Sequence, residues 1–370
     1  MELSTFAALL LATVAVVTLF RHLTRRKLNL PPGPKPWPII GNLNLLAGPL
    51  PHRNMHALVQ KYGPIMQLQF GSFPVVVGSS VQMAEAILKT NDVKLADRPR
   101  IAAGKYTTYN YSNITWSQYG PYWRQARKIC LMEIFSPKRL DQFETVRVQE
   151  LHALLRKLFL SAGKPINARD NFSDLSLSVI SRLVLGKNYT ILETQFRGSL
   201  SWICKGYIKR MKAVGQLFDG FLEHTLSEHQ KRRRGVEDYV PQDMMDILLQ
   251  LSDDPNLEVQ LDRTAVKAFT MDLIAGGTES SSVTTEWAMA ELLKKPEYFE
   301  RATEELDRVI GRERWVEEKD IANLPFINAI CKETMRLHPV SPFLKLNPDF
   351  QLTCTLCDDD DDDDMCLLRV

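Results

Sequence analysis

The segment Ala275-Gly276-Gly277-Thr278-Glu279-Ser280 brings two glycines, a carboxyl group and hydroxyl groups together inside a predicted long helix. Adjacent glycines in a helix cost roughly 1 kcal/mol each relative to alanine, so another interaction must offset that cost. Close packing of a second helix, or a kink, would do so. A flat or bulky ligand lying against the helix would also do so, and Glu279 and Ser280 could then pass protons into the ligand cavity.

Trp123 and Arg127 form a second pair suited to ligand binding. A guanidinium group presents a rigid fork of donors, so Arg127 beside an indole ring could hold an anionic group. The surrounding segment, Tyr106–Trp123, is rich in tyrosine and tryptophan and follows no helical periodicity. Aromatic side chains with polar groups can line a ligand pocket, and they can equally form a packed surface loop.

A third candidate is the charged pair Glu333 and Arg336, which the i, i+3 spacing should bring together on one helix. This helix is rich in apolar residues such as Met335 and Leu337, and His338-Pro339 ends it. A charged pair among apolar neighbours must be mutually satisfied. The same spacing occurs twice more, where we expect ordinary surface pairs: Glu144 with Arg147, and Glu305 with Arg308.

Helices must position most of these residues. Hydrophobic periodicity predicts helices over 55–62, 140–160, 172–185, 193–231, 243–251, 262–294, 296–310 and 325–338. Ser80 should cap a further helix that runs through Leu88. Alternating residues predict a pair of strands at Met66–Phe70 and Val75–Val77. The basic run Lys231–Arg234 is expected in a solvated loop. The fold class is therefore mainly α with a small β-sheet region.

The amino-terminal segment Leu3–Phe20 carries no charge over eighteen residues. As a helix it would span about 27 Å, close to the hydrocarbon thickness of a bilayer. Positive residues follow it, which predicts a membrane anchor at 1–20 with the rest of the chain in the cytosol. A buried core helix is the alternative. Residues 21–42 form a basic, proline-rich hinge, either a rigid strut or a simple spacer.

Overall composition excludes a mostly disordered, a collagenous or a disulfide-scaffold protein. The 370 residues are 45% hydrophobic and 24% charged, which are values of an ordinary globular chain. A net charge of +2 gives no reason to expect nucleic acid as a partner. Six cysteines at scattered spacings do not suggest a disulfide framework. The run Asp358–Asp364 predicts a disordered acidic tail over 345–370.

The order of these motifs resembles that of a known family. The chain carries an anchor, Pro31-Pro32-Gly33-Pro34, W-x-x-x-R, A-G-G-T-E-S-S, and E-x-x-R before L-H-P. It resembles the haem-thiolate monooxygenases, the cytochrome P-450 enzymes, in their microsomal plant form, over about residues 1–344. PPGPKPWPIIGNL and AAGKYTTYNYSNITWSQYG are similar to flavonoid 3′-monooxygenase-like members.

The resemblance implies haem as cofactor and a role for each candidate residue. Trp123 and Arg127 would bind a haem propionate. Residues Ala275, Gly276, Gly277 and Thr278 would form the groove over the haem where oxygen sits. Glu279 and Ser280 would relay protons to bound dioxygen. The pair Glu333 and Arg336 would be structural, on the proximal side. The loop 101–119, the helix near 200–215 and Val340–Phe343 would line the substrate pocket.

The implied reaction is hydroxylation of a hydrophobic or phenolic plant metabolite, flavonoid-like, with dioxygen and electrons from an NADPH-dependent reductase. The implied partners are therefore a membrane, that reductase and a small hydrophobic substrate. The implied location is the endoplasmic reticulum membrane, with a single amino-terminal span and a cytosolic catalytic domain. Residues 43–344 would form the monooxygenase domain.

The chain departs from the family pattern after Leu344. The family's iron-ligating cysteine, in F-x-x-G-x-R-x-C-x-G, is absent from this sequence. Cys354, Cys357 and Cys366 lack that loop, so no metal ligand is assigned. Three further cysteines fall in predicted helices and are expected to be buried packing residues: Cys130, Cys204 and Cys331. We therefore expect a monooxygenase fold that is incomplete at its carboxyl end and inactive as the sequence reads. The alternative is a non-catalytic, membrane-anchored fragment of a truncated or misread gene.

Overall fold

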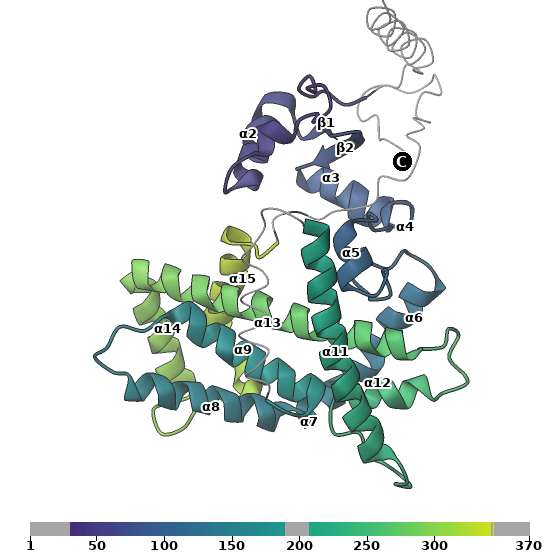
Figure 1. Cartoon of the computed structure of the whole chain (residues 1–370). Coiled ribbons are helices and arrows are strands. Elements are labelled where there is room, and N and C mark those ends of the chain that lie inside the picture. Colours follow the sequence, from purple (N-terminus) through teal and green to yellow (C-terminus); the bar gives the residue numbers. More distant parts are fainter. Residues whose placement is uncertain (1–29, 189–206, 342, 344–370) are drawn as a thin grey trace, which may run out of the picture. The chain divides into compact units, whose positions relative to one another are not determined.

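The computed structural model describes residues 30–188, 207–341 and 343 (Figure 1). The chain divides into two units, Met1–Leu95 with Asn347–Val370, and Ala96–Leu346. The predicted anchor at 1–20 and acidic tail at 345–370 lie outside the described residues. Among the described residues, no helix combines the length and apolar character that a membrane span requires.

The first unit contains the predicted pair of strands. Strand β1 (Ile65–Phe70) pairs antiparallel with β2 (Phe73–Gly78), and Phe70 lies opposite Phe73 at the turn. Side chains alternate along β1, so that Met66 and Leu68 are buried. Helices precede and follow the hairpin along the chain: η1 (Leu43–Leu46), α2 (Pro51–Tyr62), α3 (Val81–Glu85), η2 (Ala86–Thr90) and α4 (Asp92–Leu95).

Two local features of this unit follow from the sequence. The hydroxyl of Ser80 accepts a hydrogen bond from the Met83 backbone, which confirms the predicted helix cap. The proline-rich segment lies against β1, where the Gln67 backbone donates to Pro32 at 2.9 Å. A Cβ at Gly33 would lie 2.0 Å from the Gln67 carbonyl oxygen, so only glycine allows this approach.

The second unit is helical in its described part. Its elements are α5 (Ala102–Thr107), α6 (Pro121–Ile129), η3 (Cys130–Ile134), α7 (Pro137–Gln142), α8 (Glu144–Leu160), α9 (Ala168–Leu185), α11 (Tyr207–Arg233), α12 (Met244–Ser252), α13 (Arg263–Lys294), α14 (Pro296–Val309), η4 (Glu318–Asn323) and α15 (Pro325–Leu337). Proline occupies the first turn of α6, α7, α14 and α15, where its missing N–H costs nothing. Within the described residues these bounds confirm the predicted helices, except that the helix predicted over 140–160 is divided at Phe143 into α7 and α8.

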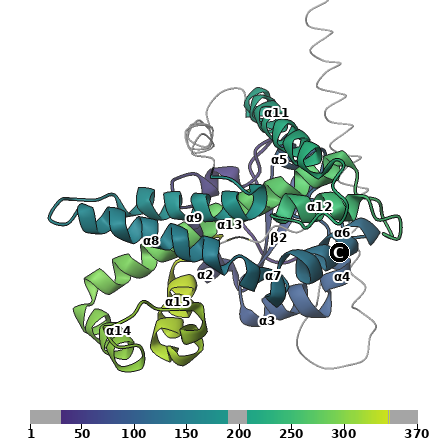
Figure 2. The same cartoon turned by 90° about the horizontal axis from the view of Figure 1, so that it is seen from below.

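Helix α13 is the central element of this unit. Figures 1 and 2 both show α9 running along α13. The amino-terminal half of α13 packs into a core with α9, α11 and α12. Phe269, Leu222 and Leu248 are almost fully buried there. One half of α13 is thus held rigidly by apolar packing, and the glycine segment begins where that packing ends.

The structure corrects one local expectation. The basic run Lys231–Arg234 is not a loop, because Lys231, Arg232 and Arg233 form the last turn of α11. Basic side chains suit the carboxyl end of a helix, where backbone carbonyls are unpaired and the helix dipole is negative.

Candidate functional site

The two glycines of α13 have different surroundings. A Cβ at Gly277 would lie 2.6 Å from Cδ1 of Ile180, so this glycine lets α9 pack closely against α13. Among the described residues, a Cβ at Gly276 would have no atom within 4 Å beyond the adjoining backbone of its own helix. Helix packing therefore explains Gly277 and leaves Gly276 unexplained. Of the alternatives raised by the sequence, close helix packing therefore applies to Gly277.

Gly276 belongs to an open face of α13. Ala275, Gly276, Glu279 and Ser280 are all exposed, and helical spacing places them on one side of the helix. Ser280 donates its hydroxyl hydrogen to the carbonyl oxygen of Gly276 at 2.6 Å. Thr278 is only half-exposed and donates to the Ile274 carbonyl oxygen at 2.7 Å. Of the predicted groove residues, the open face thus contains Ala275 and Gly276.

Arg127 offers a guanidinium group to an anion. Its guanidinium carbon lies 5.5 Å from the centre of the Trp123 ring, and the side chain is exposed. Within the described ranges, no carboxylate forms an ion pair with Arg127. The arrangement is therefore the one that the sequence predicted, an indole ring beside an unneutralised guanidinium.

Cys130 is the first residue of η3, directly after α6, and its thiol is half-buried. Burial and the charge of the Asp272 carboxylate raise its pKa, the charge of Arg127 lowers it, and the net result is a pKa of about 11. The charges of Asp272 on α13 and Arg127 on α6 therefore both influence the ionisation of this thiol. At neutral pH Cys130 is a protonated, half-buried thiol, which suits packing and not metal ligation.

Gln125 connects α6 to the segment that precedes α13. Its side-chain oxygen accepts from the Val259 backbone N–H at 2.8 Å, and its amide group donates to the Val259 carbonyl oxygen. Val259 shortly precedes α13, so the clamp sets the position of α6 relative to that helix. Sequence reasoning missed this residue, because a single glutamine carries no periodic or motif signal.

The predicted pair Glu333 and Arg336 forms on α15, with two hydrogen bonds of 2.7 and 2.6 Å. Arg336 lowers the pKa of the Glu333 carboxyl below its usual range. The prediction that the pair lies among buried apolar neighbours was wrong, because Met335 and Leu337 are exposed, as is the pair itself. Cys331 on the same helix is also exposed, not buried. Nothing in the described part of the chain covers this face of α15.

The two similar sequence pairs are not surface pairs. Arg147 binds Glu318 instead of Glu144, through two hydrogen bonds of 2.5 and 2.6 Å. Glu305 is buried, and its carboxylate accepts from the backbone N–H groups of Phe326 and Ile327. It thereby satisfies free donors in the first turn of α15. Both predictions were wrong because partners distant in sequence replace the i+3 neighbour.

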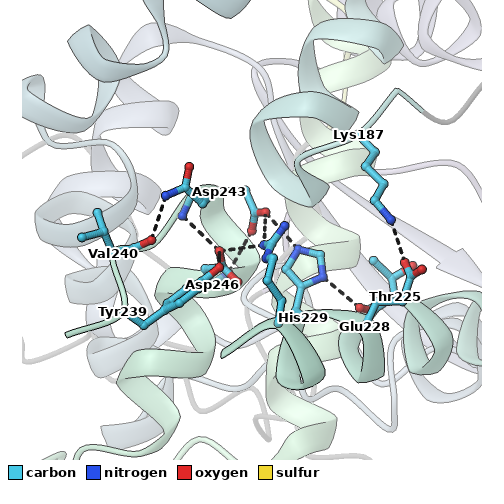
Figure 3. A network of polar contacts seen from close by, with 10 residues as sticks. Lys187, Thr225, Glu228, His229, Tyr239, Val240, Asp243 and Asp246 are labelled. Atoms are coloured by element: carbon cyan, nitrogen blue, oxygen red, sulfur yellow. Dashed lines mark hydrogen bonds and ion pairs between the residues drawn. The ribbon is translucent and has the colours of Figure 1, made fainter. Parts of the chain in front are cut away.

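A buried polar cluster joins α11 to α12, as Figure 3 shows. His229 lies 2.9 Å from an Asp243 oxygen through Nε2 and 2.8 Å from the Thr225 carbonyl oxygen through Nδ1. Arg232 donates to Asp243 at 2.9 Å and to Asp246 at 2.7 Å. Histidine and aspartate are also the ligand types that divalent cations prefer.

The contacts of this cluster pair its charged groups with one another. Both ring nitrogens of His229 face oxygen atoms that can only accept, so the ring fits as a doubly protonated imidazolium. Two cations then balance two carboxylates. Burial works to lower the pKa of His229, but the hydrogen bond and charge of Asp243 outweigh it and raise that pKa. The cluster is a structural tether between two helices.

Comparison with known proteins follows this geometry. The family model described as Cytochrome P-450 matches residues 31–203 and 194–348. Trimethyltridecatetraene synthase of Zea mays is 42% identical over 386 residues, covering 91% of this chain and 70% of the relative. Flavonoid 3′-monooxygenase of Petunia hybrida is 37% identical over 348 residues, covering 86% and 67%.

Solved structures agree with these relatives. A zebra fish cytochrome P-450 solved with progesterone superimposes with a TM-score of 0.72 at 26% identity, covering 81% of this chain and 73% of that chain. The helical unit with its long α13, the small sheet and the order of the motifs are therefore those of one family. The chain belongs to the cytochrome P-450 family, the haem-thiolate monooxygenases.

Proposed function

We propose that the open face of α13 and the Arg127 side chain are the haem-facing surfaces of a monooxygenase. Gly276 carries the proposal. Within the described part of the chain, a Cβ there would meet no atom within 4 Å beyond its own helix backbone, and a helix gains nothing from glycine at an open position. A flat cofactor lying against the helix would explain it. When bound, haem supplies the iron that activates dioxygen with electrons from a redox partner.

The residues of the chain fit this group on two sides. The guanidinium of Arg127, beside Trp123, can hold a haem propionate because no described carboxylate neutralises it. On α13, Ala275 and Gly276 leave room for the ring. The pair Glu333 and Arg336 would act structurally, by joining two positions of α15. These roles were implied by the family resemblance and remain proposals.

Glu279 and Ser280 would hold and move protons beside this face. The Ser280 hydroxyl donates to the Gly276 carbonyl oxygen, so its lone pairs are free to accept a hydrogen bond from a ligand or water. Glu279 is exposed and, among the described residues, pairs with no cation. It can therefore exchange protons with solvent and pass them towards the neighbouring hydroxyl.

We further propose that the chain, expressed as its sequence reads, does not complete catalysis. Cys130 is a protonated, half-buried thiol, and Cys331 lies on an exposed face of α15. The other four cysteines lie outside the described residues, and none belongs to the family's ligand motif: Cys204, Cys354, Cys357 and Cys366. Iron without a thiolate lacks the electron donation that favours O–O cleavage. A non-catalytic, membrane-anchored fragment is therefore the second candidate.

The substrate would be a hydrophobic or phenolic plant metabolite. The petunia relative, at 37% identity, is named for a flavonoid. The maize relative, at 42% identity, is named for a polyunsaturated hydrocarbon. A synthase is named for its product, so the higher identity favours a substrate that carries such a hydrocarbon chain, and the flavonoid remains the alternative. Attachment of residues 1–20 to the endoplasmic reticulum membrane, with the catalytic part in the cytosol and an NADPH-dependent reductase as partner, belongs to the same proposal.

The test measures haem uptake by the full chain in detergent and records the reduced carbon monoxide difference spectrum. We expect haem to bind without a thiolate-type band. Arg127→Ala should lower haem affinity, whereas the control Arg124→Ala, an exposed arginine on the same helix beside Tyr119, should not. A thiolate-type band would contradict the proposed inactivity. A folded chain that takes up no haem would support the fragment instead.

A further inference from the structure

Asp272 is a half-buried residue on α13 whose carboxylate binds a segment far away in sequence. Its oxygens accept from Asn113 Nδ2 at 2.5 Å, from the Thr115 backbone N–H at 3.0 Å and from the Thr115 hydroxyl at 3.1 Å. Asn113 is itself 1% exposed, and its side-chain oxygen accepts from the Trp116 backbone at 3.1 Å. Both polar atoms of the Asn113 side chain thus have a hydrogen-bond partner. The Nδ2 atom binds Asp272 on α13, and the side-chain oxygen binds the Trp116 backbone.

The segment that these bonds hold has a strained backbone. Tyr109, Asn110 and Tyr111 have φ values of 51°, 55° and 67°, in the left-handed region that non-glycine residues avoid. Three such residues in succession persist only where their surroundings fix them. The bonds to Asp272 follow directly, and the Tyr122 hydroxyl donates to the Ser112 carbonyl oxygen between them.

Asp272 also lies beside the proposed haem-facing surface. It precedes Gly276 by one helical turn, so the two positions are neighbours on the same side of α13. Segment 113–115 therefore sits at the amino-terminal edge of the open face that Ala275, Gly276 and Glu279 form. A ligand bound on the open face would therefore contact segment 113–115 at its amino-terminal edge.

We propose that Asp272 and Asn113 are positioning residues, which hold the aromatic segment 109–117 on α13 as a wall of the substrate space and so set the shape of substrate admitted. The proposal rests on the proposed function for its substrate side, whereas the tether stands on the contacts alone. Neither residue need touch the substrate, because each acts through the segment that it fixes.

The electrostatics of Asp272 agree with positioning. Burial raises the pKa of this carboxyl above its usual range, although the donors at Thr115 and Asn113 act in the opposite direction. A raised pKa means that folding favours the protonated form, so the ionised carboxylate lowers the stability of the folded chain at neutral pH. The ionised carboxylate of Asp272 nevertheless suits a positioning role, because it accepts hydrogen bonds from several donors at once and so fixes their geometry.

Exchanging the two side chains tests the tether. In Asp272→Asn, an NH₂ group faces the donor of Asn113, and in Asn113→Asp two carboxylates face each other. In the double variant, the amide introduced at position 272 can donate to the carboxylate introduced at position 113 and still accept from the Thr115 backbone. Hydrogen exchange of the amides in 109–117 should rise about tenfold or more in each single variant. In the double variant it should return to within about threefold of the wild type.

Two outcomes overturn the tether: single variants that fold, by circular dichroism, with unchanged exchange, or a folded double variant without rescue. The substrate side is tested on the same four proteins by tryptophan-fluorescence titration with naringenin, a flat flavanone, and geraniol, a linear isoprenoid alcohol. We expect the ratio of the two Kd values to change at least threefold in Asp272→Asn and to recover in the double variant. An unchanged ratio overturns the specificity role. Failure of the wild type to bind either probe overturns the substrate side and the proposed function together, while the exchange result still decides the tether.

Discussion

The imidazole ring of His338 lies flat on the indole ring of Trp287, with centroids 3.8 Å apart and planes 4° from parallel. The Nε2 atom of His338 also lies 3.1 Å from an oxygen of Glu291. His338 follows the last residue of α15, and Trp287 lies on α13. The stack therefore fixes the end of the helix that carries Glu333 and Arg336 on the helix that carries Gly276.

Replacing His338 should loosen this contact. We expect His338→Ala to lower the free energy of unfolding by about 1 kcal/mol, because a stacked aromatic pair contributes that order beyond its buried area. His338→Phe keeps the ring and should recover most of the loss. Urea denaturation measures both. Equal losses in the two variants would mean that the hydrogen bond to Glu291, and not the stack, holds the helix end.

Glu305 should matter far more than its sequence neighbour. Glu305→Ala leaves backbone donors in the first turn of α15 without a partner, so we expect a loss of about 1–2 kcal/mol in stability. Glu304→Ala is the matched control, because Glu304 is exposed on the same helix, and its effect should stay within about 0.5 kcal/mol. Similar losses in thermal or urea unfolding would contradict the capping role.

The pair of glycines predicts opposite effects of one substitution. Gly276→Ala should stabilise the chain without haem by up to about 1 kcal/mol, since alanine is the better helix former and the space is open. Gly277→Ala should destabilise it by about 1–3 kcal/mol, since the new methyl group meets Ile180. Urea unfolding of the two variants side by side tests this, and effects of the same sign would contradict the assignment.

The stability of the chain should depend on pH through His229. Asp243 raises the pKa of this imidazole in the folded state, despite the opposing effect of burial. The stabilisation that protonated His229 provides is therefore complete below its unfolded pKa of about 6.5, and it is lost as the pH rises through the higher folded value. The stability difference between the wild type and His229→Gln should thus shrink from pH 6 to pH 9. His224→Gln, which changes an exposed histidine on the same helix, is the control, and an equal decrease there would contradict the assignment to His229.

Local signals in the sequence predicted the elements but not which partners they meet. Periodicity placed the long helix at 262–294, and α13 spans Arg263–Lys294. No periodic signal could assign one glycine to α9 and the other to open space, because that depends on how helices pack. The partner of Arg147 lies 171 residues away and the partner of Asp272 lies 159 residues away, so spacing rules that act within one helix could not find them.

The open position at Gly276 on α13 is where we expect haem to lie against the chain. A haem titration of the full chain, followed by absorbance for the wild type, Gly276→Val and Thr285→Val, tests it directly. Thr285 is an exposed residue further along α13 and serves as the control. We predict that Gly276→Val folds and loses haem affinity by at least about tenfold, whereas Thr285→Val binds as the wild type does. Unchanged affinity in Gly276→Val would contradict the claim.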